Sequence, residues 1–90
     1  MERIVLHRAA YEEWNQVRDI LIAGGYSIIR DKKNTDYEDI IDSRGKLIGE
    51  AYRNHQSVGV EIKTTDDCLD KRLIEIGKEK GIIMDMEVRS

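Results

Sequence analysis

The spacing of hydrophobic and polar positions changes several times along the chain, and each change predicts a new element. Residues 3–7 include the β-branched pair Ile4-Val5 in a short apolar run, which predicts a first strand. A helix is predicted over roughly residues 9–23, because apolar positions then recur at helical spacing with polar residues opposite them. Gly24 and Gly25 end this helix, since glycine adopts the left-handed conformation without steric cost. The apolar stripe consists of Ala10, Trp14, Val17 and Leu21.

Short strand-like segments separated by polar turns occupy the middle of the chain. They cover residues 26–30, 37–42, 46–53 and 57–63. Gly45 follows Ser43-Arg44 and supplies the positive φ that a tight hairpin needs. In the fourth segment Val58, Val60 and Ile62 alternate with polar residues, which predicts a strand with one buried face. The last three segments are therefore predicted to form a meander.

A second helix and a last strand complete the pattern. Thr64 or Thr65 is predicted to cap a helix over roughly residues 66–80, with Asp66 and Asp67 complementing the helix dipole. Gly81 ends that helix. The helix buries the stripe Leu69, Leu73 and Ile76, and the following strand, residues 82–88, carries Ile82, Met84, Met86 and Val88 on one face.

The predicted order is β-α-β-β-β-β-α-β, which defines an α+β fold. Two helices on one face of a mostly antiparallel sheet would bury all of these stripes. This arrangement resembles a ferredoxin-like βαββαβ plan with an added hairpin. The 90 residues contain no repeat or linker, so we predict a single domain over residues 1–90.

Composition narrows the class of protein. The chain is 40% hydrophobic and 37% charged, which is typical of a soluble globular domain. It contains no apolar run long enough for a membrane span and no signal-peptide core, so we expect no membrane partner. The single cysteine indicates a reducing compartment and hence a cytoplasmic location. A net charge of -3 without a basic cluster disfavours nucleic acid as a partner.

The sequence motifs give little indication of a metal-binding or cofactor-binding site. His7, His55 and Cys68 are isolated, and their spacing matches no common metal-binding pattern. The chain contains neither GxGxxG nor GxxxxGK[ST], the glycine-rich sequences that hold nucleotide phosphates. We therefore expect no metal site and no cofactor.

One acid–lysine pattern carries a catalytic alternative. Glu61 and Lys63 leave the same face of their strand, and Asp39 and Asp42 lie on an earlier one. Two carboxylates around a divalent metal, with a lysine beside the attacked phosphate, would suit metal-assisted phosphodiester hydrolysis. With the segments Gly25–Arg30 and Glu38–Asp42, this pattern resembles small resolvase-like members of the PD-(D/E)XK nuclease family.

The nuclease resemblance implies a role for each of these residues. Asp39 or Asp42 would hold the metal with Glu61, and Lys63 would stabilise the transition state. The chain departs from the family pattern because no proline precedes the aspartate and the segment 46–53 separates the acidic strand from the Glu-x-Lys strand. A solvated strand face explains the same residues without chemistry.

Two tyrosines suggest the function that we favour from sequence. Tyr37 and Tyr52 alternate away from the small and aliphatic positions of their strands, so they could stand on an open sheet face beside Asp39 and Glu50. Tyrosines beside acids suit a protein contact, because aromatic residues often contribute much of the binding energy. Covering a sheet edge is the alternative role. We predict Tyr37, Asp39, Glu50 and Tyr52 as interaction residues.

These observations favour a small acidic module without enzymatic activity that binds another protein and inhibits or regulates it. Small anti-defence proteins of phages or mobile elements fit this profile. A homodimer formed through an open sheet face or an edge strand is compatible with the sequence. The metal-dependent nuclease is the alternative function.

Overall fold

The eight elements follow the predicted order in the computed structural model, which describes residues 3–56, 59–82 and 85–89. Ser57 and Val58 of the predicted fourth segment and Met84 of the last lie outside the described residues. The elements are β1 (Ile4–Ala10), α1 (Tyr11–Ala23), β2 (Ser27–Arg30), β3 (Tyr37–Ile41), β4 (Leu47–Asn54), β5 (Gly59–Thr64), α2 (Asp67–Lys80) and β6 (Asp85–Arg89).

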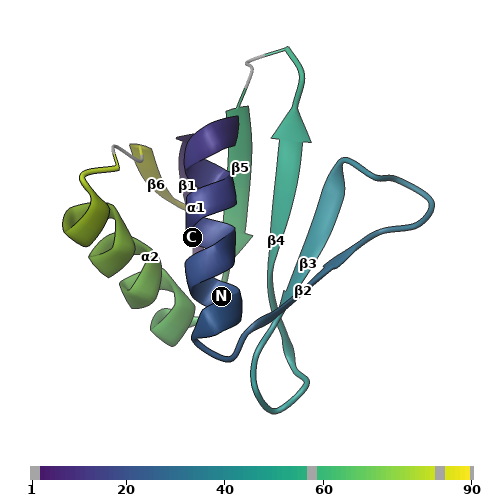
Figure 1. Ribbon diagram of the computed structural model, residues 1–90, viewed down its shortest axis with the longest axis horizontal. Coiled ribbons are helices and arrows are strands. Elements are labelled where there is room, and N and C mark those ends of the chain that lie inside the picture. The colour runs from purple at the N-terminus through teal and green to yellow at the C-terminus, as the bar shows by residue number, and fades with distance from the viewer. Residues whose placement is uncertain (1–2, 57–58, 83–84, 90) are drawn as a thin grey trace.

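All six strands form one antiparallel sheet in the order β2-β3-β4-β5-β1-β6. Helix α2 connects β5 to β6 across β1, and α1 connects β1 to the far edge at β2. Both helices lie on the same side of the sheet, and the β2–β3 hairpin extends beyond them (Figure 1). The predicted α+β class and the ferredoxin-like plan with an added hairpin are confirmed.

The hydrophobic core lies between the helices and one face of the sheet. Apart from Ala10, which is exposed at the end of β1, the predicted stripes of both helices are buried, because their apolar positions recur with the helical period and meet the inward side chains of the strands. Trp14 is the largest of these side chains and is 0% exposed. The core residues on the two helices are Trp14, Val17, Leu21, Leu69, Leu73 and Ile76, and those on the central strands include Ile40, Ala51, Val60 and Ile62.

The last strand differs from its prediction. β6 begins at Asp85, and Ile82 lies before it, buried in the core just after α2. Met86 and Val88 are paired with His7 and Val5 on the helix side of the sheet, yet both are about half exposed. The shared face of these two residues was therefore predicted correctly, but on the edge strand β6 both remain only partly covered.

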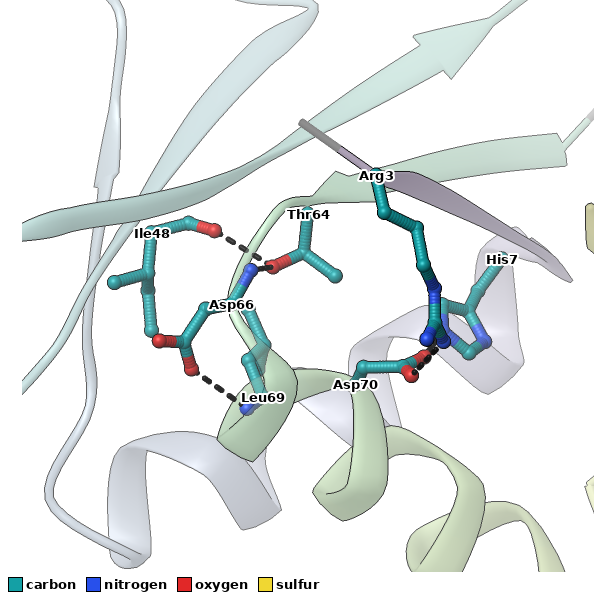
Figure 2. Close-up of polar contacts among 7 residues, drawn as sticks. All are labelled: Arg3, His7, Ile48, Thr64, Asp66, Leu69 and Asp70. Atoms are coloured by element: carbon teal, nitrogen blue, oxygen red, sulfur yellow. Dashed lines mark hydrogen bonds and ion pairs between the residues drawn. The ribbon is translucent and has the colours of Figure 1, made fainter. Parts of the chain in front are cut away.

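Helix α2 begins with a different cap from the predicted threonine. The carboxylate of Asp66 accepts the backbone N–H of Leu69 at 2.8 Å, so Asp66 is the N-cap (Figure 2). Thr64 ends β5, where its hydroxyl donates to the carbonyl of Ile48 at 2.7 Å and accepts the N–H of Asp66 at 3.0 Å. The threonine is thus engaged by the neighbouring strand rather than by the helix.

Helix α1 begins later than predicted because β1 continues through Ala10, which pairs with Gly59. At its other end Gly25, with φ 100°, holds the left-handed conformation that was expected for the Gly24-Gly25 pair. Gly81 follows α2 with φ 66°, which confirms the predicted helix end.

Candidate functional site

The sheet has a second face, opposite the helices, which we call the open face. Side chains alternate along each strand, so Val5, His7 and Ala9 on β1 point toward the helices and Leu6 and Arg8 point the other way. Of the residues that the structure describes, five carboxylates and three cations occupy the open face. The carboxylates are Asp39, Glu50, Glu61, Asp85 and Glu87, and the cations are Arg8, Lys63 and Arg89.

The four predicted interaction residues lie together on this face, in two adjacent cross-strand pairs. Tyr37 is directly opposite Tyr52, and Asp39 is directly opposite Glu50. The two tyrosine rings stack with centroids 4.8 Å apart and an angle of 28° between their planes. We call Tyr37, Asp39, Glu50 and Tyr52 the tyrosine–acid patch. The β3–β4 register thus places the two aromatic rings, at the start of β3, next to the two carboxylates of the adjacent pair on the same face.

The two acids of the patch lack the ion pairs that their neighbours form. Glu61 lies 3.6 Å from Arg8, and Glu87 lies 3.8 Å from the same arginine. No ion pair involves Asp39 or Glu50 within the described part of the chain, although Lys63 stands opposite Glu50 in register. Like charges directly opposite each other destabilise a sheet. The repulsion between Asp39 and Glu50 therefore lowers the stability of the sheet, and no ion pair within the described chain compensates for it.

An open depression of about 280 Å³ adjoins the patch. Tyr37, Glu50 and Tyr52 are part of its lining, together with the apolar side chain of Leu6 on β1, beyond β5. Its polar and apolar walls can receive a side chain from another molecule, since binding sites combine apolar area with a few oriented polar groups.

The residues of the catalytic alternative are not brought together. Asp39, Glu50 and Lys63 lie in one row across β3, β4 and β5, so Glu50 stands between the aspartate and the lysine. Glu61 belongs to the next row, opposite Tyr52. Asp39 and Glu61 are therefore on strands two places apart, about 9–10 Å at the usual strand spacing. Among the described residues, His, Cys, Asp and Glu form no group of three that could hold a metal.

Asp42 has a structural role in the β3–β4 turn. Its carboxylate accepts the backbone N–H groups of Lys46 and Arg44, each at 2.9 Å, while Gly45 takes φ 84° as predicted. The hydrogen bond from Lys46 and then that from Arg44 outweigh partial desolvation and lower the pKa of Asp42. Asp42 thus organises the turn and is separate from the open face.

A buried carboxylate, Glu38, was not predicted from the sequence. Glu38 is 1% exposed on the helix side of β3. Its Oε1 accepts the indole N–H of Trp14 at 3.2 Å, and its Oε2 accepts Nε–H of Arg18 at 2.9 Å. A second guanidinium, that of Arg53, approaches Oε1 to 3.7 Å. This cluster joins α1 to β3 and β4 and satisfies an acid that would otherwise be costly to bury.

The contacts of Glu38 also set its protonation. Burial raises the pKa of Glu38, but the hydrogen bonds from Arg18 and Trp14 and the charges of Arg18 and Arg30 lower it by more, so the pKa of this carboxyl lies below its usual value. The carboxylate is therefore ionised at neutral pH. Its position on the covered face and its contacts with Trp14, Arg18 and Arg53 indicate a structural role.

Histidine and aspartate form a second buried polar contact, between β1 and α2. Nε2 of His7 lies 2.8 Å from Oδ1 of Asp70, and Arg3 approaches the other carboxylate oxygen to 3.4 Å (Figure 2). His7 is 1% exposed, because it alternates with Val5 and Ala9 on the covered face. This alternation is a sequence signal that His7 is buried, but no pattern in the sequence indicates that Asp70 on α2 is its partner. The contact ties the start of α2 to the sheet.

The remaining histidine and the cysteine are at the surface. His55 is in the β4–β5 turn and mostly exposed, and its Nε2 lies 2.8 Å from Oδ1 of Asp36. Cys68 is exposed in the first turn of α2. Neither residue adjoins the tyrosine–acid patch in the sheet register.

Neutralising one acid of the patch is expected to leave the fold intact. Asp39→Asn or Glu50→Gln removes the like-charge contact, so the free energy of unfolding should stay unchanged or rise by about 0.2–1 kcal/mol. Urea denaturation of the purified variants measures this change. A loss of more than about 1 kcal/mol for either variant would show that the acid has a stabilising partner and is part of the folding core.

Comparison of the chain with protein-family models, curated proteins and solved structures found no match. Within the described residues, neither helix has the length and apolar character needed to cross a membrane.

Proposed function

We propose that this chain is a binding module for another protein and that the tyrosine–acid patch is the centre of its contact surface. The observation that carries the proposal is the stacked Tyr37–Tyr52 pair on the open face, next to two acids without ion pairs in the described chain. Tyrosine presents a large, rigid area with a hydroxyl group, and it is enriched among residues that dominate binding energy. Binding would regulate or inhibit the partner by occupying its surface.

The open face is the surface that the fold leaves available. Both helices cover most of the other face, where the core and the buried Glu38 and His7 contacts account for the inward side chains except Met86 and Val88 on β6. On the open face, by contrast, aromatic rings and charges are held by regular strands, whose backbone hydrogen bonds keep their spacing fixed. Such a preorganised surface loses little conformational freedom on binding.

Charge favours a protein over a nucleic acid as the occupant. Exposed aromatic rings on an antiparallel sheet can stack on the bases of single-stranded RNA, as in RNA-recognition modules. Those surfaces also need cations for the phosphates. Here carboxylates outnumber cations on the described open face, and Arg8 is already engaged by Glu61 and Glu87. A phosphate backbone would meet net negative charge there.

Differential capture tests the contact surface. The wild-type chain and a Tyr37→Ala/Tyr52→Ala variant are immobilised separately, and proteins retained from cells that naturally contain the chain are identified by mass spectrometry. We expect at least one protein to bind the wild type in a fixed ratio and to lose at least tenfold in affinity with the variant, because paired aromatic anchors commonly contribute more than about 1 kcal/mol each.

A control variant separates the surface from the fold. Glu12 lies in the first turn of α1, on the helix side of the sheet, so Glu12→Gln should retain the partner at wild-type affinity. Equal retention by wild type, the tyrosine variant and the control would contradict the assigned surface. Metal-dependent cleavage of DNA that is lost in both Glu61→Ala and Lys63→Ala would instead support the nuclease.

A further inference from the structure

We infer that the tyrosine–acid patch accepts an arginine or lysine side chain from its partner, so that the partner contributes a basic segment to the interface. This inference rests on the proposed protein-binding function and specifies the chemistry of the group that is bound. The supporting features are the facing Asp39 and Glu50 carboxylates and the stacked Tyr37–Tyr52 rings beside them.

The two carboxylates supply the charge complement. Facing acids with no ion pair in the described chain repel each other, and a cation between them removes that repulsion while it gains two attractive contacts. A guanidinium is the better ligand of the two, because its planar fork of donors can address both carboxylates at once.

The tyrosine pair supplies the second half of the site. The two stacked tyrosines are both partly exposed and both line the open depression, so part of the ring pair is accessible to another group. A cation above a tyrosine face is attracted by the ring quadrupole, which adds to the attraction of the acids. An arginine can therefore lay its plane on a ring while its donors reach the acids.

Lys63 is the internal competitor for this site. It stands opposite Glu50 in register and lines the adjoining depression together with Glu50 and Tyr52. An incoming cation must share Glu50 with this ammonium group. Removing the lysine charge should consequently strengthen cation binding, which is the reverse of the effect expected if Lys63 itself contacted an acidic ligand.

A peptide titration tests the inference with a defined ligand in place of the partner. The probes are two short capped peptides that differ only at the central residue, arginine in one and its neutral isostere citrulline in the other. Amide shifts of Tyr37, Asp39, Glu50 and Tyr52 are followed by NMR at low salt. We expect saturable shifts at these amides with the arginine peptide and at least threefold weaker binding of the citrulline peptide.

Matched variants assign the effect to the patch. Asp39→Asn and Glu50→Gln should each weaken the arginine peptide about threefold, Lys63→Ala should strengthen it about twofold, and Glu12→Gln should leave it unchanged. Added salt should weaken binding to the wild type more than to the doubly neutralised variant. Equal binding of both peptides, or a loss of binding in Lys63→Ala, overturns the inference.

The captured partner distinguishes this inference from the proposed function. If the tyrosine variant loses the partner while the two acid variants and added salt have no effect, the protein-binding function stands and the cation site is wrong. If a single-stranded oligonucleotide produces the saturable shifts and the arginine peptide does not, the occupant is a nucleic acid and both proposals fail.

Discussion

Trp14→Ala is expected to lower the free energy of unfolding by about 3–5 kcal/mol, the range typical of truncating a large buried aromatic residue. The Trp14 side chain is 0% exposed and fills the space between α1 and the sheet. Its removal creates a cavity and also takes away the indole N–H that Glu38 accepts at 3.2 Å. Both effects act in the same direction.

Trp14→Phe is the matched control for this prediction. Phenylalanine keeps most of the apolar volume but leaves Oε1 of Glu38 without its donor, so we expect a smaller loss of about 1–3 kcal/mol. Because the chain has a single tryptophan, urea unfolding is followed by circular dichroism rather than by fluorescence. A loss below about 1 kcal/mol for the alanine variant would contradict the placement of this ring in the core.

The burial of Trp14 illustrates what could be predicted from the sequence. The helical stripes of α1 and α2 and the alternation of β5 are local patterns, and local patterns follow directly from the geometry of one element. The same holds for Gly45 and Gly81, whose positive φ is a property of one residue. None of these features depends on which elements meet in the fold.

Glu38 and the His7–Asp70 contact illustrate the limit of local patterns. A glutamate in the alternating segment 37–42 looks like any strand acid, and its burial depends on Trp14 and Arg18 arriving from a helix. Similarly, Asp70 is an ordinary first-turn acid of α2 until β1 places His7 against it. Long-range partners have no signature in one sequence, so neither contact could be predicted.

The candidate site lies between these two cases. Alternation predicted that Tyr37 and Tyr52 could leave the buried side of their strands, but only the β3–β4 register places them opposite each other and brings Asp39 opposite Glu50. The separation of Asp39 and Glu61 by two strand positions, in contrast, was predicted from the meander and is confirmed by the strand order. A shift of one residue would have reversed the faces and given a different surface.

Stability and proposed binding are assigned to opposite faces of the sheet. On the helix side, the buried charged groups have partners close by, as for Glu38 with Arg18 and Asp70 with His7. On the open face, Asp39 and Glu50 face each other at a cost to the fold. Neutral residues at these two positions would avoid the repulsion, but a binding surface can keep it when a partner compensates for it. Variants on the helix side should therefore change stability, and variants on the open face should change binding.

Among variants of charged residues on the helix side, Glu38→Ala is expected to lower the free energy of unfolding the most, by about 3 kcal/mol at neutral pH. Removing one member of a buried ion pair typically costs about 3–5 kcal/mol, because the other charge stays buried without compensation. Arg18 and Arg53 keep 31% and 30% of their side chains exposed, so they can recover some hydration and the lower value applies. Glu38→Gln retains the shape and should lose about 1 kcal/mol.

The pH dependence of Glu38→Gln distinguishes a paired carboxylate from simple packing. The hydrogen bonds from Arg18 and Trp14 outweigh burial and hold the pKa of Glu38 below its unfolded value, so its ionised form stabilises the fold above the unfolded pKa, and this contribution is lost as pH falls through the folded pKa. Glutamine does not titrate, and the other acids are common to both proteins. The stability gap between wild type and Glu38→Gln, measured by urea unfolding from about pH 6 to about pH 3, should therefore narrow as the solution becomes acidic. A gap that stays constant or widens would mean that the charge of Glu38 does not stabilise the fold, and that Trp14 and Arg18 contact it without favouring its ionised form.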